Sequence, residues 1–134
     1  MNNFIKIKNI NKKYEKNKTI KVLNDITFNF ESGKIYSIVG PSGSGKSTLL
    51  NLLSLIDSPS SGSIEINKIK INYENSVEND KIRAKNIGII YQDKNLLSDF
   101  SAIENVYLPN LLLSNDKLAS INLTLNECPF IRLL

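Results

Sequence analysis

The feature that most restricts the fold of this chain is a glycine-rich octapeptide between a strand pattern and a helix pattern. Residues 34–39 are typical of a strand, and apolar residues at positions 49, 52, 53 and 56 predict one face of a helix. The spacing G-x-x-x-x-G-K-S lies between them at residues 40–47. A strand, such a loop and a helix in this order predict a site for nucleotide phosphates, whereas a chance glycine turn would not need both flanking elements.

The residue types in this loop suit phosphate binding. Glycines tolerate positive φ and let phosphate oxygens approach backbone N–H groups, and the N-terminus of the next helix favours an anion. We expect Lys46 to reach the β- and γ-phosphates, Ser47 to ligate Mg²⁺ and Thr48 to donate to the α-phosphate. The predicted nucleotide contacts are Gly40, Pro41, Ser42, Gly43, Ser44, Gly45, Lys46, Ser47 and Thr48.

The remaining elements follow from periodicity and turn residues. Alternating apolar positions predict strands at residues 5–10, 26–30 and 63–71, and a short apolar run predicts a buried strand at 86–91. We expect a turn at 31–33, a loop at 57–62 and a short helix around 80–85. Ser101 and Glu104 have the spacing of a capping box and predict a helix to about Leu108. The pattern indicates an α/β fold with an antiparallel β element at its front.

Length and composition favour one soluble domain. The chain has 134 residues, of which 41% are hydrophobic and 22% charged, which is near the globular average. Its apolar runs are too short to cross a membrane, and its N-terminus alternates instead of forming a signal-peptide core. The single cysteine, Cys128, cannot form an internal disulfide. These features predict a cytoplasmic protein.

The formal charge of +4 raises the possibility of a nucleic-acid partner. All but two of the seventeen basic residues are lysine, and they are spread over the whole chain. The densest region, residues 12–21, is interrupted by Glu15 and has no stripe of basic and aromatic residues. We therefore expect no nucleic-acid partner. A basic nucleic-acid-binding domain with a vestigial phosphate loop is kept as an alternative.

Beyond the loop, the sequence resembles the ATP-binding subunit of ABC transporters. No N-K-x-D motif, typical of guanine specificity, is present. The resemblance rests on residues 22–28, 33–50 and 55–62. Residues 87–92 and 104–109 are similar to the branch for lipoprotein release and macrolide-type export. The resemblance to ABC transporter subunits implies a P-loop NTPase-like α/β fold, the ABC ATPase core, and binding of ATP with Mg²⁺.

Two further site residues are implied by this resemblance. Tyr14 stands where the family stacks an aromatic ring on adenine, although it could instead cap an edge strand. Gln92 stands where the family places a glutamine that contacts Mg²⁺ and the attacking water, although it could be a solvent-facing residue at a strand end. With Lys46, Gln92 is the expected contributor to catalysis, and with Ser47 it is the expected metal ligand.

The later family motifs are absent from the chain. It contains no Leu-Ser-Gly-Gly-Gln signature, no Walker B strand and no histidine. Residues 1–113 are interpreted as the N-terminal part of the ATP-binding domain, ending before the Walker B strand. Residues 114–134 are expected to form a tail without a family match, which a truncated gene, a frameshift, a partial gene model or a divergent functional tail would each explain.

The resulting hypothesis is a subunit that binds ATP and belongs to a transporter that couples ATP hydrolysis to transport, while this chain alone lacks hydrolysis. The resemblance implies a transmembrane subunit and a second ATP-binding subunit, arranged head to tail, as partners. It also implies a cytoplasmic location at the inner face of the membrane. A non-catalytic nucleotide-binding module is the second alternative.

Overall fold

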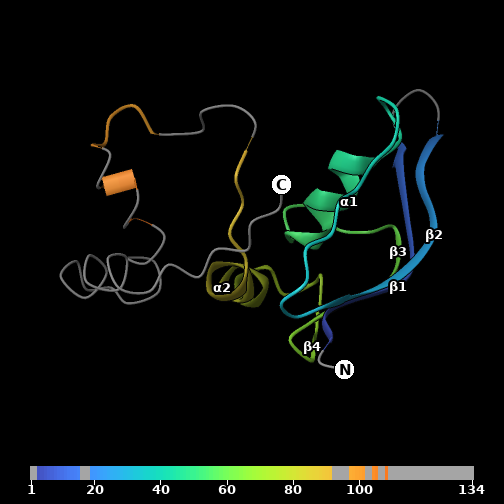
Figure 1. The fold of residues 1–134 in the computed structure, drawn as a ribbon, viewed down its shortest axis with the longest axis horizontal. Helices are drawn as coiled ribbons and strands as arrows, with labels where there is room; N and C mark the ends of the chain where they lie inside the picture. The colour runs from blue at the N-terminus through green and yellow to red at the C-terminus, as the bar shows by residue number, and fades with distance from the viewer. Residues whose placement is uncertain (1–2, 16–18, 92–96, 102–103, 106–107, 109–134) are drawn as a thin grey trace. The chain divides into compact units, whose positions relative to one another are not determined.

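The computed structural model describes residues 3–15, 19–91, 97–101, 104–105 and 108 (Figure 1). The chain divides into two compact units, residues 1–79 and residues 80–134. The first unit holds the β-sheet, the glycine-rich loop and the helix that follows this loop. The predicted nucleotide site, apart from Gln92, therefore lies within the first unit.

A four-stranded antiparallel sheet forms the framework of the first unit, with the strand order β2-β1-β3-β4. The strands are β1 (Asn3–Glu15), β2 (Thr19–Glu31), β3 (Ser61–Ile66) and β4 (Ile69–Lys70). The two long strands β1 and β2 lie side by side in Figure 1. In the pairing of β1 with β3, Ile7 lies opposite Ile64, and both are buried. The predicted alternation thus places isoleucines in the core and confirms an antiparallel element at the front of the chain.

A bulge in β1 interrupts the ladder with β2 between Ile7 and Ile10. Asn9 has φ 51° there, and side chains replace the lost pairing because Asn9 Nδ2 donates to Asp25 Oδ1 at 2.7 Å. A Cβ at Gly62 would lie 2.4 Å from the carbonyl oxygen of Asn9. Only glycine therefore lets β3 approach the bulge this closely.

The helix α1 (Lys46–Leu53) follows the glycine-rich loop, as predicted. Leu52 and Leu53 are buried, and Ser54 ends the helix with its hydroxyl donating to the carbonyl of Leu50 at 2.6 Å. The prediction that Ile56 continues the apolar face is wrong. The helix ends three residues earlier and Leu55 has φ 57°, so Ile56 leaves the helical register and is exposed.

The helix α2 (Ser76–Asn86) begins earlier than the short helix expected at residues 80–85. Asn75 explains the earlier start because its side chain accepts from the N–H of Glu78 at 3.1 Å and donates to the Glu78 carboxylate at 2.9 Å. The predicted capping box of Ser101 and Glu104 is confirmed, since the N–H of Ser101 donates to Glu104 Oε2 at 2.9 Å and the N–H of Glu104 donates to the Ser101 hydroxyl at 3.3 Å. Residues 104, 105 and 108 are helical.

Two predicted strands do not form. Residues 34–39 and 86–91 pair with no other strand among the described residues. Ile35 is 84% exposed and Val39 is 87% exposed. A strand needs a partner for its backbone groups, and apolar content alone does not supply one.

The predicted strand at 63–71 is also corrected, because it is a hairpin. Asn67 and Lys68 both have positive φ, 48° and 68°, and turn the chain from β3 into β4. Positive φ at both central residues is typical of a type I′ turn, and asparagine favours this conformation. The lysine at the second position concealed the turn in the sequence.

Candidate functional site

The glycine-rich loop joins the exposed segment 34–39 to α1. Gly43 and Gly45 have φ of 78° and 89°, in the left-handed region that glycine adopts most easily. Gly45 is also the N-cap of α1, and its carbonyl accepts from the N–H of Leu49 at 2.9 Å. The loop therefore ends at a helix N-terminus, where anions are favoured.

Lys46 is the first residue of α1, and its side chain turns back over the loop. Its Nζ donates to the carbonyl oxygens of Gly40 at 2.9 Å and Pro41 at 2.7 Å. It also lies 3.5 Å from the Ser44 hydroxyl. The Lys46 ammonium group is thus bound by two neutral carbonyl oxygens of the loop. Phosphate oxygens are stronger hydrogen-bond acceptors and can replace them.

The other predicted phosphate contacts belong to the same loop and the first turn of α1. The side chains or backbones of Pro41, Ser42, Gly43, Ser44 and Ser47 are exposed, and Thr48 is half-buried at the start of α1. A Cβ at Gly40 would lie 2.8 Å from the Ser44 hydroxyl, so the loop closes tightly on itself at this glycine. The exposed loop and the helix N-terminus together fit a phosphate group.

The strand β2 packs directly against the end of the loop. A Cβ at Gly45 would lie 3.0 Å from Leu23 Cδ2 and 3.1 Å from the carbonyl oxygen of Val22. In the β1–β2 ladder Lys12 lies opposite Leu23, and Tyr14 lies opposite Ile20. Val22 and Leu23 of β2 therefore lie next to the phosphate loop, and Tyr14 lies on the paired strand β1 near the end of the same ladder.

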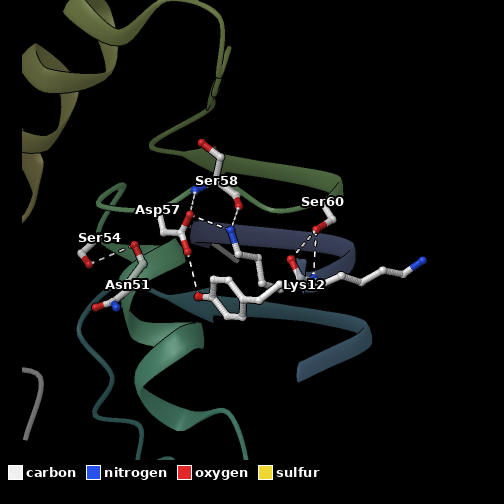
Figure 2. A network of polar contacts seen from close by, with 8 residues as sticks. Lys12, Asn51, Ser54, Asp57, Ser58 and Ser60 are labelled. Atoms are coloured by element: carbon white, nitrogen blue, oxygen red, sulfur yellow. Dashed lines mark hydrogen bonds and ion pairs between the residues drawn. The ribbon is translucent and has the colours of Figure 1, made fainter. Parts of the chain in front are cut away.

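Tyr14 belongs to a polar network that connects β1 with the segment after α1. Its hydroxyl donates to Asp57 Oδ2 at 2.9 Å, and Lys12 Nζ donates to Asp57 Oδ1 at 2.6 Å and to the Ser58 carbonyl at 2.6 Å (Figure 2). Lys12 Nζ also lies 4.8 Å from the centroid of the Tyr14 ring. Lys12 is buried, whereas 39% of Tyr14 is exposed.

The network keeps the Asp57 carboxylate ionised. Partial burial raises the pKa of Asp57, but the hydrogen bonds from Lys12, Tyr14 and the Ser58 N–H, with the charge of Lys12, outweigh burial. The pKa of Asp57 is therefore held below its ordinary value. The sequence predicted a loop at residues 57–62 and no function for Asp57. The one available signal was that Lys12 and Tyr14, two residues apart on a strand, share a face.

Gln92, the other residue implied by resemblance, lies outside the described residues. Its contact with a metal or water therefore stays a prediction. Within the described part of the chain, no helix is long and apolar enough to cross a membrane.

Comparison with known proteins identifies the family. Residues 23–131 match the family model described as "ABC transporter". This range extends beyond residue 113 into the tail, whose residues lie outside the described structure.

Individual relatives agree with this match. The lipoprotein-releasing system ATP-binding protein LolD of Wigglesworthia glossinidia brevipalpis is 46% identical over 115 residues, which are 84% of this chain and 50% of that protein. The uncharacterized ABC transporter ATP-binding protein MJ0796 of Methanocaldococcus jannaschii is 42% identical over 78% of this chain and 45% of its own length. The chain thus spans about half the length of the curated relatives it matches.

Solved structures give the same result for the fold. The dimeric post-hydrolysis structure of MJ0796 bound to ADP and Pi superposes with a TM-score of 0.80 at 36% identity, covering 90% of this chain and 54% of that one. A structure of cbiO1 from Clostridium perfringens has a TM-score of 0.72 at 28% identity, covering 91% of this chain and 47% of that one. With its glycine-rich loop, its antiparallel front sheet and the match over residues 23–131, the chain belongs to the ABC transporter family and has the fold of the N-terminal part of the family's ATP-binding domain.

Proposed function

We propose that this chain binds ATP with Mg²⁺ through residues 40–48, as part of the ATP-binding subunit of an ABC transporter. The observation that carries the proposal is the position of Lys46, whose ammonium group lies over the loop at the N-terminus of α1 on the Gly40 and Pro41 carbonyls. An ammonium group, exposed loop backbone and a helix N-terminus together attract a polyphosphate. The MJ0796 structure bound to ADP and Pi supports a nucleotide as the ligand.

Each residue of the site has a separate role in this proposal. Lys46 exchanges its carbonyl partners for oxygens of the β- and γ-phosphates, which are stronger acceptors. The Ser47 hydroxyl ligates Mg²⁺, and Thr48 donates to the α-phosphate. Tyr14 stacks on the adenine base, which its partly exposed ring allows. Gln92 approaches the metal and the attacking water.

This chain binds the nucleotide in the proposed function, and sustained hydrolysis belongs to the complete transporter. Positioning and charge stabilisation account for most phosphoryl-transfer catalysis. The chain carries no signature motif, no Walker B carboxylates and no histidine, which the family's hydrolytic site uses. We therefore expect ATP to bind without repeated turnover by the isolated chain. In this proposal residues 1–113 carry the nucleotide-binding part of the ATP-binding domain, and the family match continues beyond them to residue 131.

The transporter context supplies the proposed partners and location. A transmembrane subunit would carry out the transport that is coupled to ATP. A second ATP-binding subunit, arranged head to tail with this one, would complete each nucleotide site. Two of the similar structures of MJ0796 are described as dimeric, which supports the second of these partners. The chain would then lie on the cytoplasmic face of the membrane. Its similarity to several LolD proteins favours the branch for lipoprotein release.

The test is a titration of the full chain with Mg-ATP. Wild-type protein should bind, and Lys46→Ala should lose more than tenfold in affinity because it removes the charge that faces the terminal phosphates. Lys34→Ala is the matched control, since this lysine is exposed and outside the loop. Equal affinities for Lys46→Ala and wild type would overturn the proposal. Binding of RNA or DNA that survives Lys46→Ala and declines with salt would favour a nucleic-acid partner instead.

A further inference from the structure

The segment that follows α1 is fastened to β1 by several polar contacts. The N–H of Ser60 donates to the Asn11 carbonyl at 2.8 Å, and the Ser60 hydroxyl accepts from the N–H of Lys13 at 2.9 Å. Lys12 and Tyr14 add the contacts to Asp57 and Ser58 (Figure 2). Since α1 starts in the phosphate loop, this segment connects the far end of the loop helix with the strand that carries Tyr14.

The Tyr14 ring is held at two points, and 39% of Tyr14 is exposed. Its hydroxyl is tethered to Asp57, and Lys12 Nζ lies over the ring at 4.8 Å from the centroid. The ammonium group occupies one face, so a stacking partner approaches the opposite face. A tethered ring has lost most of its rotamer freedom before any ligand arrives, so less entropy is lost when a base stacks on it.

We propose that Asp57 and Lys12 are positioning residues for the nucleobase, because they hold the Tyr14 ring in place and direct the base to the face opposite Lys12. This inference rests on the proposed function, in which Tyr14 contacts adenine. It gives Asp57, which lies outside the phosphate loop, a role in ligand binding.

The proposal separates the base from the phosphates, and the experiment uses this separation. The full chain is titrated with Mg-ATP and with Mg-tripolyphosphate, which has the phosphates without the base. Tyr14→Phe keeps the ring and removes only the tether, so ATP affinity should fall roughly three- to tenfold, the range of one hydrogen bond, with tripolyphosphate affinity unchanged. Asp57→Ala should have the same selective effect. Tyr14→Ala should weaken ATP binding further because the stacking surface is lost.

A double-mutant cycle then tests whether Asp57 acts through Tyr14. In the Asp57→Ala background, Tyr14→Phe should cause no further loss of ATP affinity, because the tether is already absent. Independent losses in the cycle, or an equal loss for ATP and tripolyphosphate, would mean that Asp57 supports the fold and does not position the base. Tyr14→Phe alone keeps the proposal testable if Asp57→Ala does not fold.

Failure of this inference can be distinguished from failure of the proposed function. If Lys46→Ala binds ATP as well as wild type, the phosphate site itself is overturned. If Lys46→Ala loses ATP but Tyr14→Ala does not, the phosphate site stands and the base-positioning role of Tyr14, Asp57 and Lys12 is overturned. Selective loss of ATP in both Tyr14→Phe and Asp57→Ala, without additivity, supports the inference.

Discussion

Lys46 Nζ lies 2.7 Å from the carbonyl oxygen of Pro41, so the cation of the phosphate loop is bound by the loop's own backbone. A ligand must therefore exchange these carbonyl contacts for its own. Exposed contacts of this kind contribute little to folding, because water replaces them when they are lost.

The first prediction follows from this exchange. Lys46→Ala should leave the melting temperature of the protein without ligand almost unchanged but remove the increase that Mg-ATP causes in wild type. Thermal unfolding monitored with and without Mg-ATP measures both quantities. A large loss of stability without ligand would mean that the lysine holds the loop together and is not reserved for phosphate.

Gly45→Ala should destabilise the protein more than Gly33→Ala. Both glycines have positive φ, 89° and 74°, so each alanine carries backbone strain of about 1 kcal/mol. Only at Gly45 would the new methyl group meet atoms, namely Leu23 Cδ2 and the Val22 carbonyl oxygen, whereas nothing lies within 4 Å at Gly33. Urea unfolding should give an additional loss of roughly 1–2 kcal/mol for Gly45→Ala. Equal losses of stability would show that Val22 and Leu23 move away from the new methyl group without destabilising the protein.

Stability should decrease on acidification because of Asp57. The pKa of Asp57 is lower in the folded protein than its ordinary value of 3.8, so the unfolded chain binds more protons at acidic pH. The contribution of Asp57 is present above about pH 4 and is lost as pH falls through the folded pKa. Melting temperatures from pH 7 to pH 3 should therefore decline less steeply for Asp57→Asn than for wild type. Asp99→Asn, at an exposed carboxylate, is the control and should follow wild type.

Tyr73→Phe should stabilise the protein by about 1 kcal/mol. The Tyr73 hydroxyl is buried and has no hydrogen-bond partner among the described residues. Burial also raises the pKa of Tyr73 to about 12. Wild type should therefore lose stability between pH 10 and pH 12, where the unfolded chain ionises first, and Tyr73→Phe should lose less. Denaturant titrations at pH 7 and pH 11 test both effects, and a destabilised phenylalanine variant would reveal a partner for the hydroxyl.

In the proposed transporter, the segment after Gln92 should contact the transmembrane subunit. Leu96, Leu97, Phe100 and Val106 are the candidate contacts, of which Leu97 and Phe100 are described and are 54% and 43% exposed. Asn105 supports this segment by donating from Nδ2 to the carbonyls of Leu97 and Phe100, both at 3.1 Å. A photo-crosslinker at Leu97 or Phe100 should capture a membrane subunit, and one at Val77, which is 65% exposed, should not. Capture from Val77 alone would contradict this interface.

Local features were predictable from the sequence. The loop at residues 40–47, the helix after it and the capping box of Ser101 and Glu104 depend on contacts within a few residues, so their patterns are visible in the chain itself. The alternation within residues 5–10 and 63–71 predicted strands there, and Ile7, Ile64 and Ile66 of these segments are buried. Ile10 is buried as well, because the bulge between Ile7 and Ile10 shifts the alternation by one residue. The family could be identified because the phosphate loop occurs together with other family motifs.

Only the tertiary structure determined which distant groups meet. The contact between Tyr14 and Asp57 spans 43 positions and depends on how the segment after α1 lies on β1, which no periodicity encodes. The segment 34–39 has a strand-like sequence but pairs with no strand among the described residues, which leaves Ile35 and Val39 exposed. A strand exists through the hydrogen bonds of its neighbours, so its sequence specifies a propensity, and the partners supplied by the fold decide whether it forms.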